Sequence, residues 1–264
     1  MFDGIFNDEV RFFSDNYEFS GINLLEIAYR SSSEAKTILG NNVGITVPTG
    51  PTQQQMTLNR ELIYRDPVID YTGANPIAGS IFYNDEYYGF NEAYLLNYSL
   101  SCAVGAVPKS SSSFIIADEM MSGISGAKKR IVKKHPIIDP PSQGSISITC
   151  DNFETNRVTS FNYSLNVNRK LLYSVGEILP CSVELIKPIS FTANATIDVD
   201  NAFLENSHNF LKERENKNVS INIKGRDGNE IQSVNIPNAS IVNEILRISS
   251  EGDLKLDINY VGHG

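Results

Sequence analysis

Tryptophan is absent from the 264 residues of this chain, and cysteine and histidine occur only three times each. Cys102, Cys150 and Cys181 are odd in number and far apart, which predicts buried, reduced thiols and neither a disulfide framework nor a zinc site. No apolar stretch approaches the ~20 residues that span a bilayer. The first nine residues lack the basic start and apolar run of a signal peptide, so we expect no membrane segment and folding in a cytosol.

Patterns typical of catalysis or ligand binding are also lacking. The histidines are His135, His208 and His263, and their spacing matches no metal-binding motif. The acidic pairs Asp85–Glu86 and Asp118–Glu119 are expected to be solvated turns, because the sequence cannot place them across a sugar. We therefore expect no enzyme activity and no catalytic, cofactor-binding or metal-binding residue.

Positive charge is in deficit, since 22 Lys and Arg face 31 Asp and Glu, giving a formal net charge of −9. A protein that grips nucleic acid usually carries the opposite sign, because neutralising phosphates supplies most non-specific affinity. Nucleic acid could pass close to this protein, but we do not expect it to be held.

Strand patterns dominate what is present. Residues 144–150 and 219–224 alternate apolar and polar side chains, as strands with one buried face do. Two hairpins are predicted, one around the turn at 225–229 and one joining 245–249 to 254–260. In the second, Leu254, Leu256, Ile258 and Tyr260 should share one face.

Helix patterns are few. The spacing of Phe203, Leu204, His208 and Leu211 predicts a helix over about 201–216, and a second candidate lies between residues 23 and 39. Residues 126–144, rich in glycine, proline and basic residues, read as a linker. The predicted division is an N-terminal β domain at 1–125 with an extra N-terminal segment, and a C-terminal β domain at 145–264.

A short repeat crosses that linker. Asn-Tyr-Ser-Leu at 97–100 recurs at 162–165, and Val-Gly followed by proline comes after each copy, at 104–108 and 175–180. The repeat favours two copies of one β unit. A single large β domain with a coincidental match is the alternative.

The segments 94–108, 158–165 and 172–184 resemble tail tube proteins and related virion structural proteins of tailed bacteriophages. This resemblance implies a mainly β fold, with β-sandwich domains in tandem, a short flanking helix, and sheets that join between subunits into a ring-shaped barrel. It also implies a virion protein made in the host cytoplasm and assembled in the phage tail. Its rings would stack on one another, contact other tail proteins and pass DNA to the host.

Several alternatives stay open at this stage. Trimeric rings with pseudo-sixfold symmetry are favoured over hexamers by the repeat, and a distal-tail, neck or baseplate component could share the fold. A carbohydrate-binding or adhesin-like β-sandwich would instead present Tyr83, Tyr87 and Tyr88 to its ligand. If the last strand lies at a subunit seam, a charge at Ile258 would block assembly.

Overall fold

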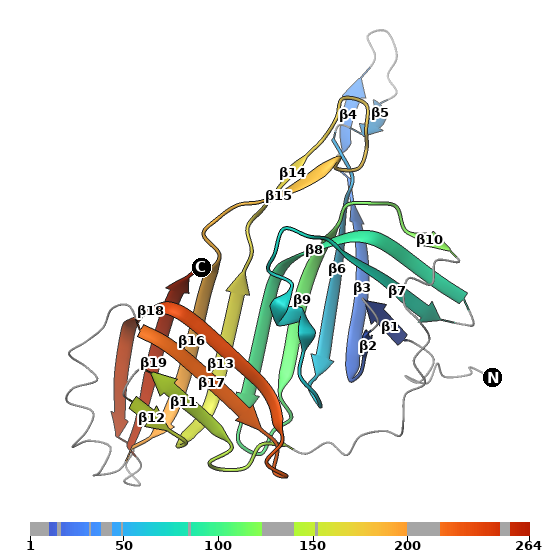
Figure 1. The fold of residues 1–264 in the computed structure, drawn as a ribbon. Coiled ribbons are helices and arrows are strands. Elements are labelled where there is room, and N and C mark those ends of the chain that lie inside the picture. The colour runs from blue at the N-terminus through green and yellow to red at the C-terminus, as the bar shows by residue number, and fades with distance from the viewer. Residues whose placement is uncertain are drawn as a thin grey trace.

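The protein is mainly β, as the sequence predicts (Figure 1). The computed structural model describes residues 11–14, 17–31, 33–37, 44–48, 50–83, 86–122, 140–150, 153–199, 217–248 and 254–264. Within these ranges there is no α-helix, and the one 3-10 helix is η2 (Pro67–Asp70). The N-terminal strands are β1 (Arg11–Ser14), β2 (Tyr17–Phe19), β3 (Ile22–Arg30), β4 (Ser33–Thr37), β5 (Gly44–Pro48), β6 (Gln53–Glu61), β7 (Ile77–Tyr83), β8 (Glu86–Ala103), β9 (Lys109–Ile116) and β10 (Met121–Ser122). The C-terminal strands are β11 (Ile146–Cys150), β12 (Phe153–Thr155), β13 (Val158–Asn166), β14 (Arg169–Leu172), β15 (Ser182–Leu185), β16 (Ser190–Asp198), β17 (Lys217–Lys224), β18 (Glu230–Ile248) and β19 (Leu254–His263).

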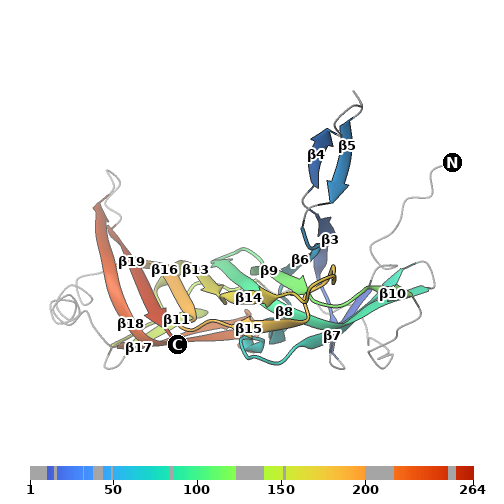
Figure 2. The same cartoon turned by 90° about the horizontal axis from the view of Figure 1, so that it is seen from above.

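Eight strands form one continuous antiparallel run, which we call the curved sheet. Its order is β3-β6-β9-β8-β13-β16-β19-β18. The run is open, with β3 at one end and β18 at the other. Figure 2 shows it as an arc whose two ends turn toward the same side. Both halves of the chain therefore build one sheet, joined where β8 pairs with β13.

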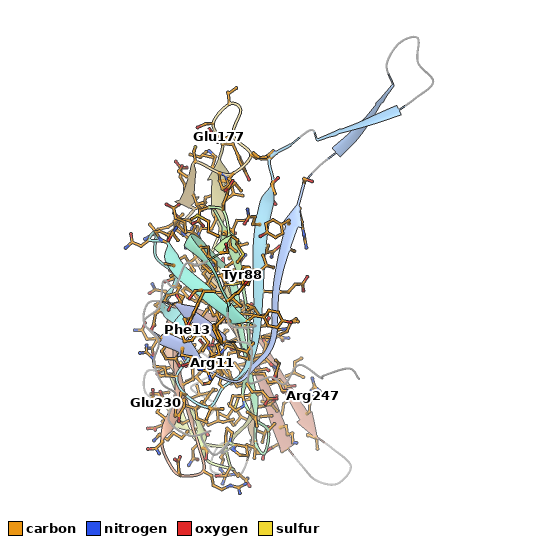
Figure 3. The ribbon with its side chains drawn as sticks, turned by 90° about the vertical axis from the view of Figure 1, so that its right-hand side faces the viewer. Arg11, Phe13, Tyr88, Glu177, Glu230 and Arg247 are labelled. Atoms are coloured by element: carbon orange, nitrogen blue, oxygen red, sulfur yellow. The ribbon has the colours of Figure 1, made fainter. Side chains whose placement is uncertain are left out.

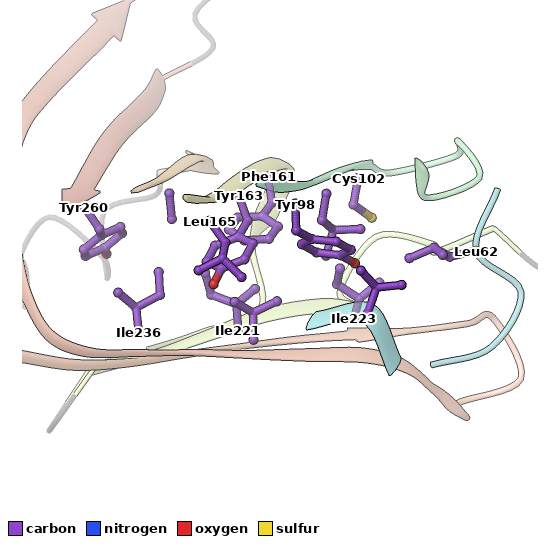
Figure 4. Close-up of a cluster of buried hydrophobic side chains, with 14 of the residues drawn as sticks. Leu62, Tyr98, Cys102, Phe161, Tyr163, Leu165, Ile221, Ile223, Ile236 and Tyr260 are labelled. Atoms are coloured by element: carbon purple, nitrogen blue, oxygen red, sulfur yellow. The ribbon is translucent and has the colours of Figure 1, made fainter. Parts of the chain in front are cut away.

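A second layer packs against the convex side of this arc. The long strands β8 and β18 each continue from one layer into the other, because their first halves pair with β7 and β17 and their second halves with β9 and β19. Between the layers lies a core of buried aliphatic and aromatic side chains, including Phe161, Leu165 and Ile221 (Figure 4). This burial makes the molecule β-sandwich-like and fixes the register of the alternating strands.

The same set of pairings occurs in both halves of the chain. In the first half the pairs are β1–β2, β1–β7, β7–β8, β8–β9, β6–β9, β3–β6 and β4–β5. In the second half they are β11–β12, β11–β17, β17–β18, β18–β19, β16–β19, β13–β16 and β14–β15, so each label is ten higher. Register irregularities recur as well, at Leu95/Asn97 and Ile241/Asn243, and at Ile22/Leu24 and Val158/Ser160. Bulges at matching positions are specific features, so they align the two halves residue by residue.

This alignment differs from the one that the tetrapeptides suggest. Asn97-Tyr98-Ser99-Leu100 lies in β8 and Asn162-Tyr163-Ser164-Leu165 in β13, and these strands pair with each other, with Ser99 opposite Ser164. By its pairings, β8 corresponds to β18, and β13 corresponds to β3. The identical tetrapeptides are therefore neighbours at a junction and do not occupy equivalent positions.

The two predicted hairpins are confirmed as β17–β18 and β18–β19, with Leu256, Ile258 and Tyr260 buried on one face. The helix expected between residues 23 and 39 is wrong, because β3 and β4 occupy this segment. Because of the bulge at Ile22/Leu24, Ile22 lies on the same face as Leu25 at a spacing of three residues, which hides the alternation of Leu25, Ile27 and Tyr29. The helix expected at 201–216 and most of the 126–144 linker lie outside the described residues.

The pairing of β19 bears on the hypothesis that the last strand lies at a subunit seam. This strand is paired on both sides, with β16 and with β18, and Ile258 is 0% exposed. A charge at Ile258 would therefore disturb the core of the single chain, and it would not report on a subunit seam.

Cys102 and Cys150 are buried and Cys181 is exposed, which corrects the expectation for the third thiol. Burial raises the pKa of Cys102 to about 12, so its reactive thiolate is scarce at neutral pH. We predict that a thiol reagent at pH 8 labels Cys181 quickly in the native protein and reaches Cys102 and Cys150 only after denaturation. A native Cys181→Ser protein that still gave a fast-reacting thiol would contradict this arrangement.

A buried ion pair ties three parts of the fold together. Arg60 in β6 donates from Nη1 to Asp66 Oδ1 at 2.8 Å, and both side chains are 1% exposed. The second oxygen of Asp66 accepts from Ser110 in β9, and its backbone N–H donates to Gln232 in β18. Hydrogen bonds to both carboxylate oxygens offset the cost of burying the charges. Through Gln232, the loop after β6 is held to the C-terminal half.

Candidate assembly interface and polar face

The concave side of the curved sheet carries short, uncharged polar side chains across five adjacent strands, β6, β9, β8, β13 and β16. We call this surface the polar face. Cross-strand partners identify its members as Thr57, Asn59, Ser111, Ser113, Asn97, Ser99, Ser101, Asn162, Ser164, Asn166, Thr192 and Asn194. One row of it runs from Asn59 through Ser111, Ser99 and Ser164 to Thr192.

Many of these side chains can bond to one another. Ser111 Oγ donates to Asn59 Oδ1 at 2.6 Å, and Asn97 Nδ2 donates to Ser113 Oγ at 3.1 Å. A shallow depression over β8, β13 and β16 is lined mainly by Ser, Asn and Thr side chains. Charged side chains lie at the margins of the surface, for example Glu61 opposite Lys109.

This composition limits what the polar face can do. Its members include no cation to neutralise a phosphate and no aromatic ring on which a base could stack. They also include no carboxylate, so the net charge of −9 does not lie on this surface. The polar face is suited to hydrogen bonding with water and offers little to hold a polyanion.

The two ends of the curved sheet have the opposite character. Among the described residues no strand pairs with the outer edge of β3, or with the outer edge of β18 from Asn243 to Ile248. Six large apolar side chains on these two strands are exposed: Leu24 43%, Tyr29 58%, Val242 60%, Ile245 41%, Leu246 50% and Ile248 74%. Exposed apolar edge strands are templates for pairing with another chain, and proteins that remain monomeric usually protect them.

Charged side chains accompany the apolar ones. Arg247, near the end of β18 (Figure 3), is 69% exposed and contacts Asp257 Oδ2 through Nε at 2.8 Å. On the opposite edge, Glu26 is exposed on β3. Arg30 is also exposed on β3, and Glu244 lies on β18, so each edge carries charges of both signs among apolar neighbours.

Two hairpins extend from the curved sheet at the same end of the molecule (Figure 1). The β14–β15 hairpin packs over one end of the concave side, where Val183 and Leu171 contact a cluster of Tyr94, Ile115 and Ala117. It is held further by Arg169, which donates from Nη2 to Gly73 O at 2.7 Å. The β4–β5 hairpin projects away from the sheet (Figure 2).

The residues singled out from the sequence do not form a site. Phe82 lies opposite Tyr87 while Tyr83 lies opposite Glu86, so the pleat puts Tyr87 on one face and Tyr83 with Tyr88 on the other. Asp118 accepts hydrogen bonds from the backbone N–H groups of Asn91 and Glu92, which is a structural role. His263 lies in β19, and His135 and His208 fall outside the described residues.

Sequence reasoning missed the two edges. An exposed Leu246 looks the same in a sequence as a buried one, and only the pairing order tells which strand lies at an end. The one available signal is the apolar run around Ile245 and Leu246, which lacks clear alternation.

In the part of the chain that the structure describes, no helix is long and apolar enough to cross a membrane. Within the same residues, no three His, Cys, Asp or Glu side chains gather in a group that could hold a metal ion. Comparison with protein-family models gives no match, and comparison with curated proteins gives none either.

Proposed function

We propose that this chain is a structural protein of the phage-tail tube type, which assembles with copies of itself into a ring. The observation that carries the proposal is the curved sheet with two unpaired, apolar ends. Strand direction alternates along its eight strands, so β3 and β18 run in opposite directions. The β18 of one copy can therefore pair antiparallel with the β3 of the next and continue the same alternation.

Closing the sheets into a ring removes both edges. Each seam would cover Tyr29, Leu246 and Ile248 and complete the unpaired backbone groups of the two edges. The polar face lies on the concave side of the arc, so in a ring it would line the channel.

The recurring pairings support a tandem of two β-sandwich units, one in residues 1–125 and one in 145–264. Each unit contributes four strands to the curved sheet. Three such chains would give a ring with pseudo-sixfold symmetry, and we favour this trimer over a hexamer. The rings would stack into a tube in the virion, where they contact other tail proteins.

The proposed cargo of the channel is DNA in passage. Over β6, β9, β8, β13 and β16 the wall of Ser, Thr and Asn offers no cation to retain phosphate, so a duplex could slide past this part of the channel. An acidic wall would act by repulsion, whereas this uncharged part of the wall acts by failing to bind.

Electron microscopy of the purified, concentrated protein tests the proposal. We expect hollow rings or stacked tubes, with end views that distinguish three subunits from six. Single rings that never stack would favour a distal-tail, neck or baseplate component over a tube. Monomers alone at high concentration, with small-angle scattering that shows no larger species, would contradict self-assembly and favour a binding module.

A further inference from the structure

We infer the register in which two copies join: β18 of one copy lies beside β3 of the next, with Leu246 opposite Ile27 and Arg247 opposite Glu26. The inference rests on the proposed ring assembly and goes beyond it, because it specifies which residues meet. Its source is the junction between β8 and β13, which the chain forms within itself.

The recurring bulges allow this internal junction to be transferred. Leu95 and Asn97 flank a bulge beside β9 as Ile241 and Asn243 do beside β19, so Leu100 corresponds to Leu246 and Ser101 to Arg247. In the same way, the bulges at Val158/Ser160 and Ile22/Leu24 make Tyr163 correspond to Ile27 and Asn162 to Glu26.

The internal junction then fixes the seam. Leu100 pairs with Tyr163, and Ser101 pairs with Asn162. If the second unit meets the next copy as the first unit meets the second, Leu246 pairs with Ile27 and Arg247 with Glu26. Ile248 then lies opposite Leu25, and Ile245 lies opposite Ala28.

Several side chains that are exposed on the edge strands β3 and β18 correspond to side chains that are buried at the internal junction. Leu100 is 1% exposed, and its counterpart Leu246 is 50% exposed. Cys102 is 5% exposed, and its counterpart Ile248 is 74% exposed. On the other strand, Leu165 is 0% exposed and its counterpart Tyr29 is 58% exposed. Leu246, Ile248 and Tyr29 thus occupy positions that are covered at the junction, whereas Ile245 corresponds to Ser99, which is exposed on the polar face.

Charge distinguishes this register from its neighbours. A shift by one residue would turn the apolar side chains of one strand to the opposite face. A shift by two would place Arg247 opposite Leu24 or Ala28, and only the inferred register gives it a carboxylate. The contact with Asp257 uses Nε, and a guanidinium has further donors for a second carboxylate.

The β4–β5 hairpin, which projects from the sheet in the single chain, also fits this register. The β14–β15 hairpin extends from β13 and covers the neighbouring strands, where Leu96 packs against its cluster. The β4–β5 hairpin extends from β3, the counterpart of β13. The β4–β5 hairpin of the next copy would therefore reach over Val242 of the first copy. Val242 is the counterpart of Leu96 and is 60% exposed.

Engineered disulfides test the register directly. In a Cys181→Ser background, the double variant Ala28→Cys with Ile245→Cys should oxidise into covalent oligomers. These two positions lie on β3 and β18, at opposite ends of the curved sheet of one chain, so they meet only between copies. The matched control, Leu24→Cys with Ile245→Cys, is offset by four residues, roughly 13 Å along a strand, and should cross-link at least about tenfold less. The largest covalent species on a non-reducing gel counts the chains in a ring.

Charge reversal gives an independent readout. Glu26→Arg and Arg247→Glu should each raise the concentration needed for assembly, and the double variant should assemble better than either single one. Arg226→Glu, at an exposed turn, should leave this concentration unchanged.

The outcomes separate the two proposals. Rings that form normally but cross-link through positions 24 and 245, or that show no rescue by the double charge reversal, would overturn the register alone. A protein that stays monomeric at every concentration would overturn the register and the ring together.

Discussion

Replacing Leu246 by alanine should abolish assembly at micromolar concentration and leave the folding of the single chain almost unchanged. The side chain is half exposed in the single chain, so its loss there should alter the free energy of unfolding by less than about 0.5 kcal/mol. At the inferred seam it becomes buried, where a leucine contributes roughly 2 kcal/mol, or about 30-fold in affinity at each seam.

The matched variant is Leu100→Ala, because Leu100 holds the equivalent position at the internal junction and is 1% exposed. This variant should lose about 3–5 kcal/mol of stability, as truncation of a fully buried leucine does. Urea unfolding of dilute protein measures the stability, and sedimentation velocity of concentrated protein measures the assembly. Equal stability losses in the two variants would mean that Leu246 is covered within its own chain, and normal assembly of Leu246→Ala would remove it from the seam.

Replacing Asp66 by asparagine should lower the free energy of unfolding by roughly 3–5 kcal/mol, because the charge of Arg60 then stays buried without a counter-charge. The exposed pair Arg65–Asp70 is the control. Its contact of 2.7 Å is as short as the 2.8 Å of Arg60–Asp66, but its side chains are 63% and 55% exposed. Arg65→Ala should therefore cost no more than about 0.5 kcal/mol.

A third variant isolates the charge itself. Arg60→Met combined with Asp66→Asn removes the buried cation, so it should unfold at a higher urea concentration than Asp66→Asn alone. A double variant less stable than Asp66→Asn would show that the contacts of Arg60 with Ser20 and the Phe19 ring outweigh its charge.

The sequence predicts the β class and several strands correctly because those strands have one buried face. Val219, Ile221 and Ile223 alternate with polar residues, and the pleat turns that alternation into burial. At β3 the same logic fails, since a bulge interrupts the alternation and leaves an apolar cluster that resembles a helix face. Local pattern is sufficient where the ladder is regular and misleading where it is not.

The recurrence of the same pairings in the two halves is harder to find in the sequence. Residues at equivalent positions differ in chemistry: Ser101 corresponds to Arg247, and Asn162 corresponds to Glu26. What recurs is the pairing and the bulges, which depend on backbone geometry and leave few identical residues. The identical tetrapeptides arise for another reason, since Tyr98, Leu100, Tyr163 and Leu165 all contribute to one stretch of core at the junction.

The difference between the two junctions has a consequence for how a ring would form. The β8–β13 junction is made within one chain, so its formation does not depend on concentration, whereas every β18–β3 junction requires an encounter between copies. In such a ring, half of the junctions would therefore be complete before any encounter takes place. At the internal junction Ser101 lies opposite Asn162, and both are neutral. At the β18–β3 junction Arg247 would lie opposite Glu26, and both are charged. A copy that approached the internal junction would find neither a free edge nor a matching charge, so growth would be directed to the two ends of the curved sheet.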